Sequence, residues 1–494
     1  MNKVYVWMPG HSQTLMAKND ETILSVLTRS GINIPAPCGG NGTCGKCAVN
    51  TSDGVKLACQ ACAKAGMDIY LSQPAEDAFA IVDTYESQRP YISGRDKGYG
   101  IAIDIGTTTL AFELIDMGSC NRVGSHSMAN SQRAVGADVV TRIKEATGGA
   151  GQRLHECIIQ DIRQGIGDII IAAGFSPCDI TTVAIAGNTT MLHLLQNLPC
   201  DTLGVFPFTP VDINIKICDF TRIFDEGLLG AAQLILLPGI STFVGADISG
   251  GILCCQSPVD TKPNLLIDLG TNGEMALFCG DKVLVTSTAA GPAFEAANIS
   301  MGVASIPGAV AKASFLPDGN VFRYETIDNK PPIGICGTGV IDIAAELVRH
   351  NLVDETGRLE DEYFDEGVII APGVIFTQKD MREIQLAKSA VRSGIEILLD
   401  VAGYSYNDIG RVFLAGGFGF RINIDSAVTL GLIPAKLADK VVTVGNTSLG
   451  GAAHVLLDTT AEKDITALAA RAEEVALSTH PRFNDLFMEH MMFE

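Results

Sequence analysis

The sequence lacks any run of eighteen uninterrupted apolar residues, so it predicts no membrane-spanning helix. Its opening stretch, MNKVYVWMPGHSQTL, lacks the apolar centre of a signal peptide. Basic residues are scarce: 35 Lys and Arg stand against 56 Asp and Glu, for a formal charge of −21. This balance argues against binding to nucleic acid or to anionic membranes. We therefore expect a cytoplasmic protein with other kinds of partner.

The composition is that of a soluble globular protein, with 47% hydrophobic and 18% charged residues. A chain of 494 residues exceeds what one hydrophobic core supports, so two to four domains are expected. Without a secretion signal, the 14 cysteines are expected to be thiols or metal ligands in a reducing compartment, and not disulfides.

Three cysteines lie close together in the glycine-rich stretch PCGGNGTCGKCAVN: Cys38, Cys44 and Cys47. A plant-type [2Fe–2S] site likewise takes three ligands from one loop and a distant fourth. Glycines leave backbone N–H groups free to turn towards cluster sulfurs and allow the loop to wrap tightly. A zinc site is the weaker alternative, because this loop holds a single C-x-x-C pair. The fourth ligand is Cys59 or Cys62.

Around this loop the order of elements resembles a β-grasp ferredoxin of the adrenodoxin-like variety, over residues 1–76. ETILSVLTRSGINIPAPC reads as a short amphipathic helix with an extended continuation, and CAVNTSD and MDIYLSQP as strands. In that family the last ligand follows a hydrophobic residue in an LxC element, which favours Cys59. Residues 77–99 are polar and lack a steady period, so we interpret them as a linker.

The stretch IDIGTTTLAFEL predicts a strand–turn–strand hairpin suited to phosphate. Its strand ends near Asp104 and turns at Gly106. Backbone N–H groups and the hydroxyls of Thr107, Thr108 and Thr109 could face the anion, and the aspartate could hold Mg²⁺ directly or through water.

A second stretch, IDLGTNGEMALF, repeats this pattern further along the chain. Asp268 aligns with the aspartate of the first hairpin, and Gly270, Thr271 and Asn272 form the second turn. A duplicated core hairpin predicts two similar lobes that face each other across a cleft.

Two glycine turns add candidate nucleoside contacts. In ICGTGVIDIAAELV, Gly337 and Gly339 precede helical spacing, so a helix N-terminus could meet a phosphate or ribose. In RVFLAGGFGFRI an apolar strand leads to Gly416, Gly417 and Phe418, where the backbone can approach a flat ring closely.

Two further stretches, VAIAGNTTMLHLL and VTVGNTSLGGAAHVL, share a strand–GNT–helix layout. The first is expected to occupy in the first lobe the place that the Gly416 turn has in the second.

Together these motifs resemble the acetate and sugar kinase/Hsp70/actin superfamily. The resemblance implies ATP with Mg²⁺ as ligand, and residues 100–260 and 261–494 as the two lobes. It assigns phosphate contacts to the two hairpins and nucleoside contacts to the glycine turns. Asp104 and Asp268 are the best candidate carboxylates for positioning metal and water. The expected fold class is thus α+β and α/β: a β-grasp [2Fe–2S] domain followed by a duplicated, two-lobed actin/Hsp70-like ATPase.

The whole chain resembles the reductive activators of corrinoid proteins, on further stretches such as GADVVTRI, FVGADISGGIL, TAAGPAFEAANI and HPRFNDLF. The resemblance implies ATP-dependent, one-electron reduction of inactive cobalt(II) to cobalt(I) through a [2Fe–2S] cluster. Its implied partners are a corrinoid protein of a methyltransferase system and an upstream low-potential electron donor, with a homodimer as one expected assembly. The linker is shorter than is usual in that family, and no [4Fe–4S] cysteine run follows Cys336, which points to its bacterial branch.

Two other functions use related parts. A small-molecule kinase of the same fold would leave the cysteine domain without a task. An activator of a radical-type dehydratase couples ATP to low-potential electrons, but binds a [4Fe–4S] cluster between subunits and lacks a ferredoxin domain. The four N-terminal cysteines therefore favour the corrinoid activator.

Overall fold

The computed structural model describes residues 2–8, 11–18, 21–30, 32, 34, 47–71, 83–91, 98–224, 227–257, 259–270, 272–317, 321–419 and 421–493. Three predicted ligand-binding residues, Cys38, Cys44 and Thr271, lie outside these ranges. Among the helices in these ranges, none is long and apolar enough to cross a bilayer.

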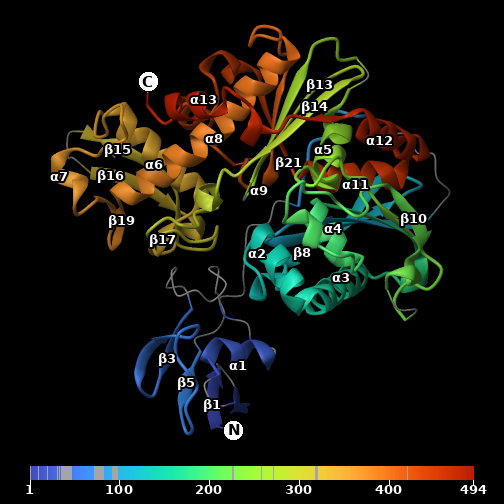
Figure 1. Ribbon diagram of the computed structural model, residues 1–494. Helices are drawn as coiled ribbons and strands as arrows, with labels where there is room; N and C mark the ends of the chain where they lie inside the picture. Colours follow the sequence, from blue (N-terminus) through green and yellow to red (C-terminus); the bar gives the residue numbers. More distant parts are fainter. Residues whose placement is uncertain are drawn as a thin grey trace.

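The N-terminal domain is a five-stranded sheet with one helix in its core, drawn in blue in Figure 1. Along β1, Val4 and Val6 are fully buried while Tyr5 and Trp7 are exposed, as a half-buried strand requires. The sheet order is β2-β1-β5-β3-β4, which confirms the expected helix and the two later strands and adds an unpredicted β1–β2 hairpin. The elements are β1 (Asn2–Met8), β2 (His11–Ala17), α1 (Ile23–Arg29), β3 (Ala48–Thr51), β4 (Gly54–Leu57) and β5 (Asp68–Tyr70).

A six-stranded sheet in the order β10-β11-β9-β6-β7-β8 forms the first half of the region expected to be a two-lobed ATPase. Its central strands are almost completely buried, which is typical of a sheet covered by helices on both faces. Its strands are β6 (Tyr99–Ile105), β7 (Thr109–Asp116), β8 (Asn121–Ala129), β9 (Ile180–Gly187), β10 (Lys216–Asp219) and β11 (Gln233–Leu236). Its helices include α2 (Val139–Glu145), α3 (Gly151–Ala173) and α4 (Thr189–Leu195).

A second six-stranded sheet follows, in the order β21-β20-β12-β13-β14-β22. Its strands are β12 (Asn264–Leu269), β13 (Gly273–Cys279), β14 (Lys282–Thr288), β20 (Val412–Ala415), β21 (Val441–Gly445) and β22 (Glu473–Glu474). Helices α8 (Gln378–Ala402), α9 (Gly416–Gly419), α12 (Thr459–Arg471) and α13 (Phe483–Glu489) also belong to this part of the chain.

The two large sheets repeat one topology, as the duplicated hairpins predict. In the first, β6 pairs antiparallel with β7 and parallel with β9. In the second, β12 pairs antiparallel with β13 and parallel with β20. The strand of VAIAGNTT therefore holds the place in the first sheet that the strand before Gly416 holds in the second, which confirms that expectation.

Each half has one helix that packs against the sheet of the other half. Helix α5 (Ala246–Cys255) follows the first sheet but packs its Ile248 and Ile252 with Leu266 of the second. Helix α11 (Thr447–Leu457) follows the second sheet but lies in the core of the first. The two helices run next to each other in Figure 1, and a Cβ on Gly451 would lie 2.3 Å from Gly250 Cα. Their backbones are therefore in contact at the junction of the halves.

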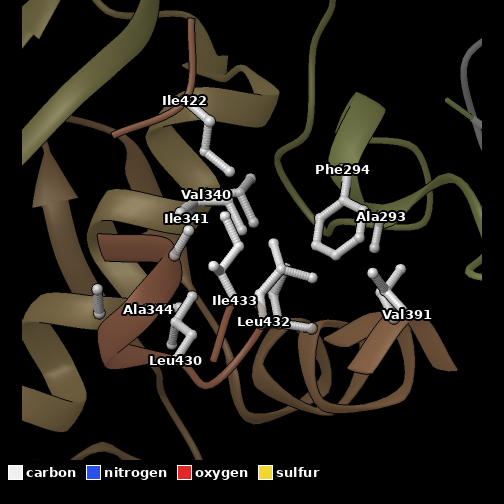
Figure 2. Packing of buried hydrophobic residues seen from close by; sticks show 14 of the residues in the cluster. Ala293, Phe294, Val340, Ile341, Ala344, Val391, Ile422, Leu430, Leu432 and Ile433 are labelled. Atoms are coloured by element: carbon white, nitrogen blue, oxygen red, sulfur yellow. The ribbon is translucent and has the colours of Figure 1, made fainter. Parts of the chain in front are cut away.

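A smaller sheet, β16-β15-β17, lies beside helix α6 (Gly337–Arg349) at one end of the second half (Figure 1). Figure 2 shows Val340, Ile341 and Ala344 of α6 packed towards Leu430 and Ile433. This apolar contact fixes the helix that begins with the predicted glycine turn. The remaining elements are β15 (Ala309–Leu316), β16 (Val321–Thr326), β17 (Gly334–Ile335), α7 (Asp361–Phe364), β18 (Val368–Ala371), β19 (Val374–Phe376) and α10 (Ile424–Thr429).

Candidate functional site

Asp104 lies at the end of β6, and two donors from the far end of the chain hold its carboxylate. Asn446 Nδ2 donates to Asp104 Oδ2 at 2.9 Å, and Ser448 Oγ donates to Oδ1 at 2.7 Å. Burial raises the pKa of Asp104, and these two hydrogen bonds act in the opposite direction. The first hairpin is thus joined to the start of α11, which leaves the second sheet.

The two GNT turns have the same local structure. Asn188 caps α4 by accepting from Met191 N at 2.9 Å, and Asn446 caps α11 by accepting from Leu449 N at 2.9 Å. Each asparagine also uses its amide on the first hairpin, since Asn188 Nδ2 donates to Thr107 Oγ1 at 3.3 Å. Both turns therefore position the first hairpin as well as starting a helix.

Arg142 is completely buried and holds this hairpin through hydrogen bonds. Its guanidinium donates to Thr107 O at 2.5 Å, Gly136 O at 2.9 Å and Gln132 Oε1 at 3.3 Å. Burial lowers the pKa of Arg142 to about 10, so it remains charged at neutral pH. The turn is further held by Asn130, whose side chain donates to Gly106 O at 2.9 Å.

The second hairpin lies among carboxylates. Burial raises the pKa of Asp268 to about 7, with further contributions from Asp247, Asp104 and Glu295. Burial also raises the pKa of Asp247 to about 7, and the charge of Asp104 adds to this. We call Asp104, Asp247, Asp268 and Glu274 the carboxylate site.

Glu274 is placed in the carboxylate site by strand pairing, because it lies directly opposite Asp268 in the β12–β13 register. Burial raises its pKa well above the usual range, and the charges of Asp247 and Asp268 act in the same direction. Like charges that interact disfavour each other's ionisation, so the site favours a cation or bound protons. Among the described residues, no three His, Cys, Asp or Glu side chains converge closely enough to chelate a metal alone.

The Gly416 turn reaches the carboxylate site directly. Gly416 has φ +88°, and a Cβ there would lie 2.5 Å from Asp268 Oδ1 and 2.7 Å from Leu269 O. No larger residue fits this approach without moving the aspartate. Gly417 and Phe418 follow in α9, and a Cβ on Gly417 would have no atom of the described residues within 4 Å. The backbone there is open to a ligand.

The other predicted glycines have structural tasks that the pattern alone did not show. Gly270 N donates to Asn272 O at 3.0 Å and so closes the second hairpin. Gly337 and Gly339 are both buried in the first turn of α6. A Cβ on Gly339 would lie 2.2 Å from Val310 O, so this glycine permits the close packing of α6 on β15.

In the N-terminal domain the structure places two of the predicted cluster ligands together. Cys47 Sγ and Cys59 Sγ are 3.2 Å apart and both side chains are buried. This is far beyond the S–S bond of about 2.05 Å, so the two are separate thiols. The side chain of Cys62 is exposed. A buried pair of soft sulfur ligands suits an iron–sulfur cluster, and favours Cys59 as the fourth ligand.

Several residues of the site were not predicted from the sequence. Asp247 lies inside a stretch quoted for the family resemblance, FVGADISGGIL, but no motif marked its carboxylate. Asn188 and Asn446 had a usable signal in the repeated GNT. Arg142 lies in the quoted stretch GADVVTRI and Ser448 in VTVGNTSLGGAAHVL, but neither stretch indicated their contacts, because only the packing of distant segments brings them to the hairpin.

Three family models match the chain. The model described as "2Fe-2S iron-sulfur cluster binding domain" matches residues 8–64, and "RACo middle region" matches residues 99–257. "C-terminal domain of RACo the ASKHA domain" matches residues 262–494. The chain belongs to the RACo family. This membership confirms the predicted fold class, because it joins a [2Fe–2S] domain to an ATPase of the expected superfamily.

Proteins similar to this RACo-family chain include two with names that state an activity. "Corrinoid activation enzyme RamQ" of Eubacterium limosum is 28% identical, over 99% of each chain. "[Co(II) methylated amine-specific corrinoid protein] reductase" of Methanosarcina barkeri is 27% identical, over 79% of this chain and 76% of its own. A solved structure titled "Reductive activator for corrinoid,iron-sulfur protein" superposes with a TM-score of 0.72 at 25% identity, over 100% of this chain and 98% of the other.

Proposed function

We propose that this protein uses ATP to drive the one-electron reduction of inactive cobalt(II) in a corrinoid protein to cobalt(I), which supports cobalamin-dependent methyl transfer. One observation carries the proposal: a single chain holds a buried cysteine pair in a [2Fe–2S] domain and a duplicated ATPase fold in which the charge of Asp104 on the first hairpin raises the pKa of Asp268 on the second. The names of the relatives support the choice of a corrinoid protein as substrate.

When bound, the [2Fe–2S] cluster supplies the single electron that the cobalt centre accepts. Cys47 and Cys59 would hold it together with Cys38 and Cys44, which lie outside the described residues. Clusters of the plant type have reduction potentials of about −400 mV. For each further ~59 mV of negative potential that the substrate requires, the equilibrium constant for transfer of one electron falls about tenfold. A weak donor therefore needs a second source of free energy, which is the role of ATP.

The two hairpins are proposed to bind the phosphates of ATP. In the first, the turn from Gly106 to Thr109 offers backbone N–H groups and threonine hydroxyls, and Asn188 orients the hydroxyl of Thr107. In the second, the turn from Gly270 to Asn272 has the equivalent place. The nucleoside would contact the start of α6 at Gly337 and Gly339, and the α9 turn of Gly416, Gly417 and Phe418.

The carboxylate site is proposed to hold Mg²⁺ and the water that attacks the γ-phosphate. Mg²⁺ prefers oxygen ligands, keeps several waters and bridges substrate phosphates, so few protein ligands are needed. A divalent cation would also relieve the repulsion that raises the pKa values of Asp247 and Asp268. Asp104 and Asp268 orient the attacking water through their carboxylate oxygens.

ATP can supply free energy only by acting differently on two states of the complex. We propose that nucleotide binding favours a complex in which the cobalt(II) centre loses an axial ligand, and that hydrolysis then releases the partner. A low-potential donor would reload the cysteine domain between turnovers. The protein is expected to act in the cytoplasm, and a homodimer is its expected assembly.

The test is an anaerobic mixture of the reduced protein, MgATP and a cobalt(II) corrinoid protein, followed by absorption. The cobalt(I) band is expected to form with ATP and to form much more slowly without it. A colourless protein with stoichiometric zinc, or no cobalt(I) in the complete mixture, would contradict the proposal.

The cysteines provide a matched pair of variants for the cluster. Cys59→Ser is expected to abolish the visible absorption of a [2Fe–2S] protein, whereas Cys62→Ser is expected to keep it with full iron content. The reverse outcome would move the fourth ligand to Cys62. Retention of full iron content and absorption in both variants would contradict the predicted ligand set.

A further inference from the structure

Residues 83–91, inside the segment expected to be a linker, are bound along the ATPase-like body. Their backbone contacts fall at the junction of the two halves. Glu86 N donates to Val444 O at 2.9 Å, at the end of β21, and Gln88 N donates to Cys254 O at 3.0 Å, at the end of α5. We call residues 83–91 the strap.

Side chains fix the strap at several points. Ser87 Oγ is hydrogen-bonded to His454 Nε2 at 2.6 Å, and the Tyr91 ring stacks on the same histidine with centroids 4.5 Å apart. Arg89 forms ion pairs with Asp464 at 2.6 Å and with Asp458 at 3.7 Å. These partners lie on or beside α11, which packs on the first sheet, and α12, which packs on α11, α5 and β14 of the second sheet.

Two other side chains of the strap each contact a different half of the body. Gln88 Oε1 accepts from Arg411 Nη1 at 2.6 Å, immediately before β20 of the second sheet. Asp83 pairs with Arg122 on β8 of the first sheet at 2.9 Å. A segment held by both halves is sensitive to their relative movement.

Glycines make room for the strap where it passes α11. A Cβ on Gly445 would lie 2.2 Å from Thr84 O, and a Cβ on Gly450 would lie 2.8 Å from Tyr85 Cδ2. Gly445 also has φ +74°, which other residues rarely adopt. The body is therefore shaped for the strap, and the contact is more than a chance alignment of a polar segment.

One residue joins the strap to the carboxylate site. The backbone N–H of Asn446 donates to Thr84 O at 2.9 Å, while its side chain donates to Asp104 Oδ2 at 2.9 Å. Its Oδ1 caps α11. A shift of the Asp104 carboxylate towards a bound ligand must therefore change the hydrogen bonding of the residue that anchors the strap.

We propose that nucleotide binding at the carboxylate site changes how the strap is held on the body, and that Asn446 is the positioning residue that links the two. The proposal rests on the proposed function, because it takes the carboxylate site as the place where nucleotide binds. Coupling is reciprocal: if nucleotide changes strap binding by some factor, strap binding changes nucleotide affinity by the same factor. Factors of about 5–150 are typical of such coupling.

The test measures amide hydrogen exchange of Glu86, Gln88 and Asn446 in the full-length protein, with and without a non-hydrolysable ATP analogue and Mg²⁺. In the wild type, nucleotide is expected to change these exchange rates by about fivefold or more. The readout needs no corrinoid protein and no reduced cluster, so it is independent of the redox reaction.

Two variants separate coupling from simple support of Asp104. Asn446→Ser keeps an N-cap oxygen and the backbone N–H but loses the donor to Asp104. Ser448→Ala removes the other donor to the same carboxylate without touching the strap. Both are expected to weaken nucleotide binding, but only Asn446→Ser is expected to abolish the response of the strap amides.

A second pair of variants avoids the carboxylate site. Arg89→Met is expected to speed exchange of the strap amides and to change nucleotide affinity, by the reciprocity of coupling. Its control is Arg482→Met, which removes an exposed ion pair with Asp400 away from the strap. Arg482→Met is expected to leave both quantities as in the wild type.

The outcomes are distinguishable. Nucleotide binding with no change at the strap amides, or equal responses in Asn446→Ser and Ser448→Ala, would overturn the coupling and leave the proposed function standing. Absence of nucleotide binding to the wild type would overturn both. A normal strap response together with no cobalt reduction would overturn the proposed function alone.

Discussion

The two phosphate hairpins have the same backbone pattern and opposite surroundings. The first is surrounded by donors: Asn446 and Ser448 hold Asp104, while Arg142 and Asn188 hold Thr107. Around Asp268 in the second, the neighbours that raise its pKa are other carboxylates. The duplication has therefore produced one hairpin whose aspartate is held by hydrogen-bond donors and one whose aspartate, among the described residues, is influenced by other carboxylates. We interpret the second hairpin as the part whose protonation changes when nucleotide and metal bind.

The sharpest test of this comparison substitutes the two equivalent aspartates. Asp104→Asn and Asp268→Asn are each expected to slow ATP hydrolysis by about 10²–10⁴-fold, because each removes a group that positions water or metal. The free energy of unfolding should distinguish the two variants. Asp104→Asn keeps one accepting oxygen but loses one of the two accepted hydrogen bonds and turns an NH2 group towards a donor, so it should unfold about 1–3 kcal/mol more easily.

Asp268→Asn removes a carboxylate from among like charges, so at pH 8 its free energy of unfolding should equal or exceed that of the wild type. Denaturant titration of both variants at pH 8 checks the difference. Equal losses of stability in the two variants would show that the two hairpins have similar surroundings after all.

Replacing Arg142 tests the support of the first hairpin. Arg142→Met leaves the carbonyls of the partly buried Thr107 and the buried Gly136 without their donor, at a cost of up to about 1–3 kcal/mol for each acceptor. The expected result is a lower midpoint of unfolding and weaker nucleotide binding. Replacing the exposed Arg358, which pairs with Asp361, is the control and should change stability by less than about 1 kcal/mol.

Two glycines of the second half test the close approach to Asp268. Gly416→Ala is expected to cost about 1–3 kcal/mol through its positive φ and to displace the aspartate, so nucleotide affinity should also fall. Gly280→Ala has φ +56° but nothing within 4 Å of the added Cβ. Gly280→Ala should therefore lose stability but keep the nucleotide affinity of the wild type. Calorimetric titration with nucleotide distinguishes the two effects, and equal affinities in both variants would contradict the proposed contact.

The pH dependence of stability gives the smallest effect. In the folded protein the pKa values of Asp247 and Asp268 are raised to about 7, above their ordinary values. Their protonated forms therefore favour the fold below the ordinary pKa, and this contribution is lost as pH rises through about 7. Mg²⁺ binds the ionised carboxylates, so stabilisation by Mg²⁺ and nucleotide should grow from pH 6 to pH 8 with release of protons.

Thermal unfolding at several pH values, with and without MgATP, measures that growth. In Asp268→Asn the growth should be smaller, because one of the two titrating groups is gone. A wild-type stabilisation that stays constant from pH 6 to pH 8 would contradict the assigned protonation.

The sequence predicted the parts of the molecule that repeat along the chain. The paired hairpins at Asp104 and Asp268, and the glycine turn at Gly416, are local patterns whose spacing reflects strand and turn geometry. The contacts that could not be predicted form between segments that are far apart in the sequence. Asn446 donates to an aspartate 342 residues earlier, which requires α11 to leave one sheet and pack on the other.

The strap shows the same limit in another way. Its polar composition predicted a linker, and the stretch from Asp83 to Tyr91 carries no motif for docking. Its contacts become visible only when Gly445, His454 and Cys254 are assembled around it. Sequence patterns report the periodicity of an element, whereas specific binding of an irregular segment depends on a surface formed by other parts of the chain.

The central claim is that ATP bound between the two hairpins drives electron transfer from the cysteine domain. The most direct measurement is the rate of cobalt(I) formation from a cobalt(II) corrinoid protein in one turnover, with wild-type and Asp268→Asn proteins matched for reduced cluster content. The account predicts rapid cobalt(I) formation by the wild type with ATP, and a rate at least about 10²-fold lower in the variant. Equal rates in the two proteins would contradict it.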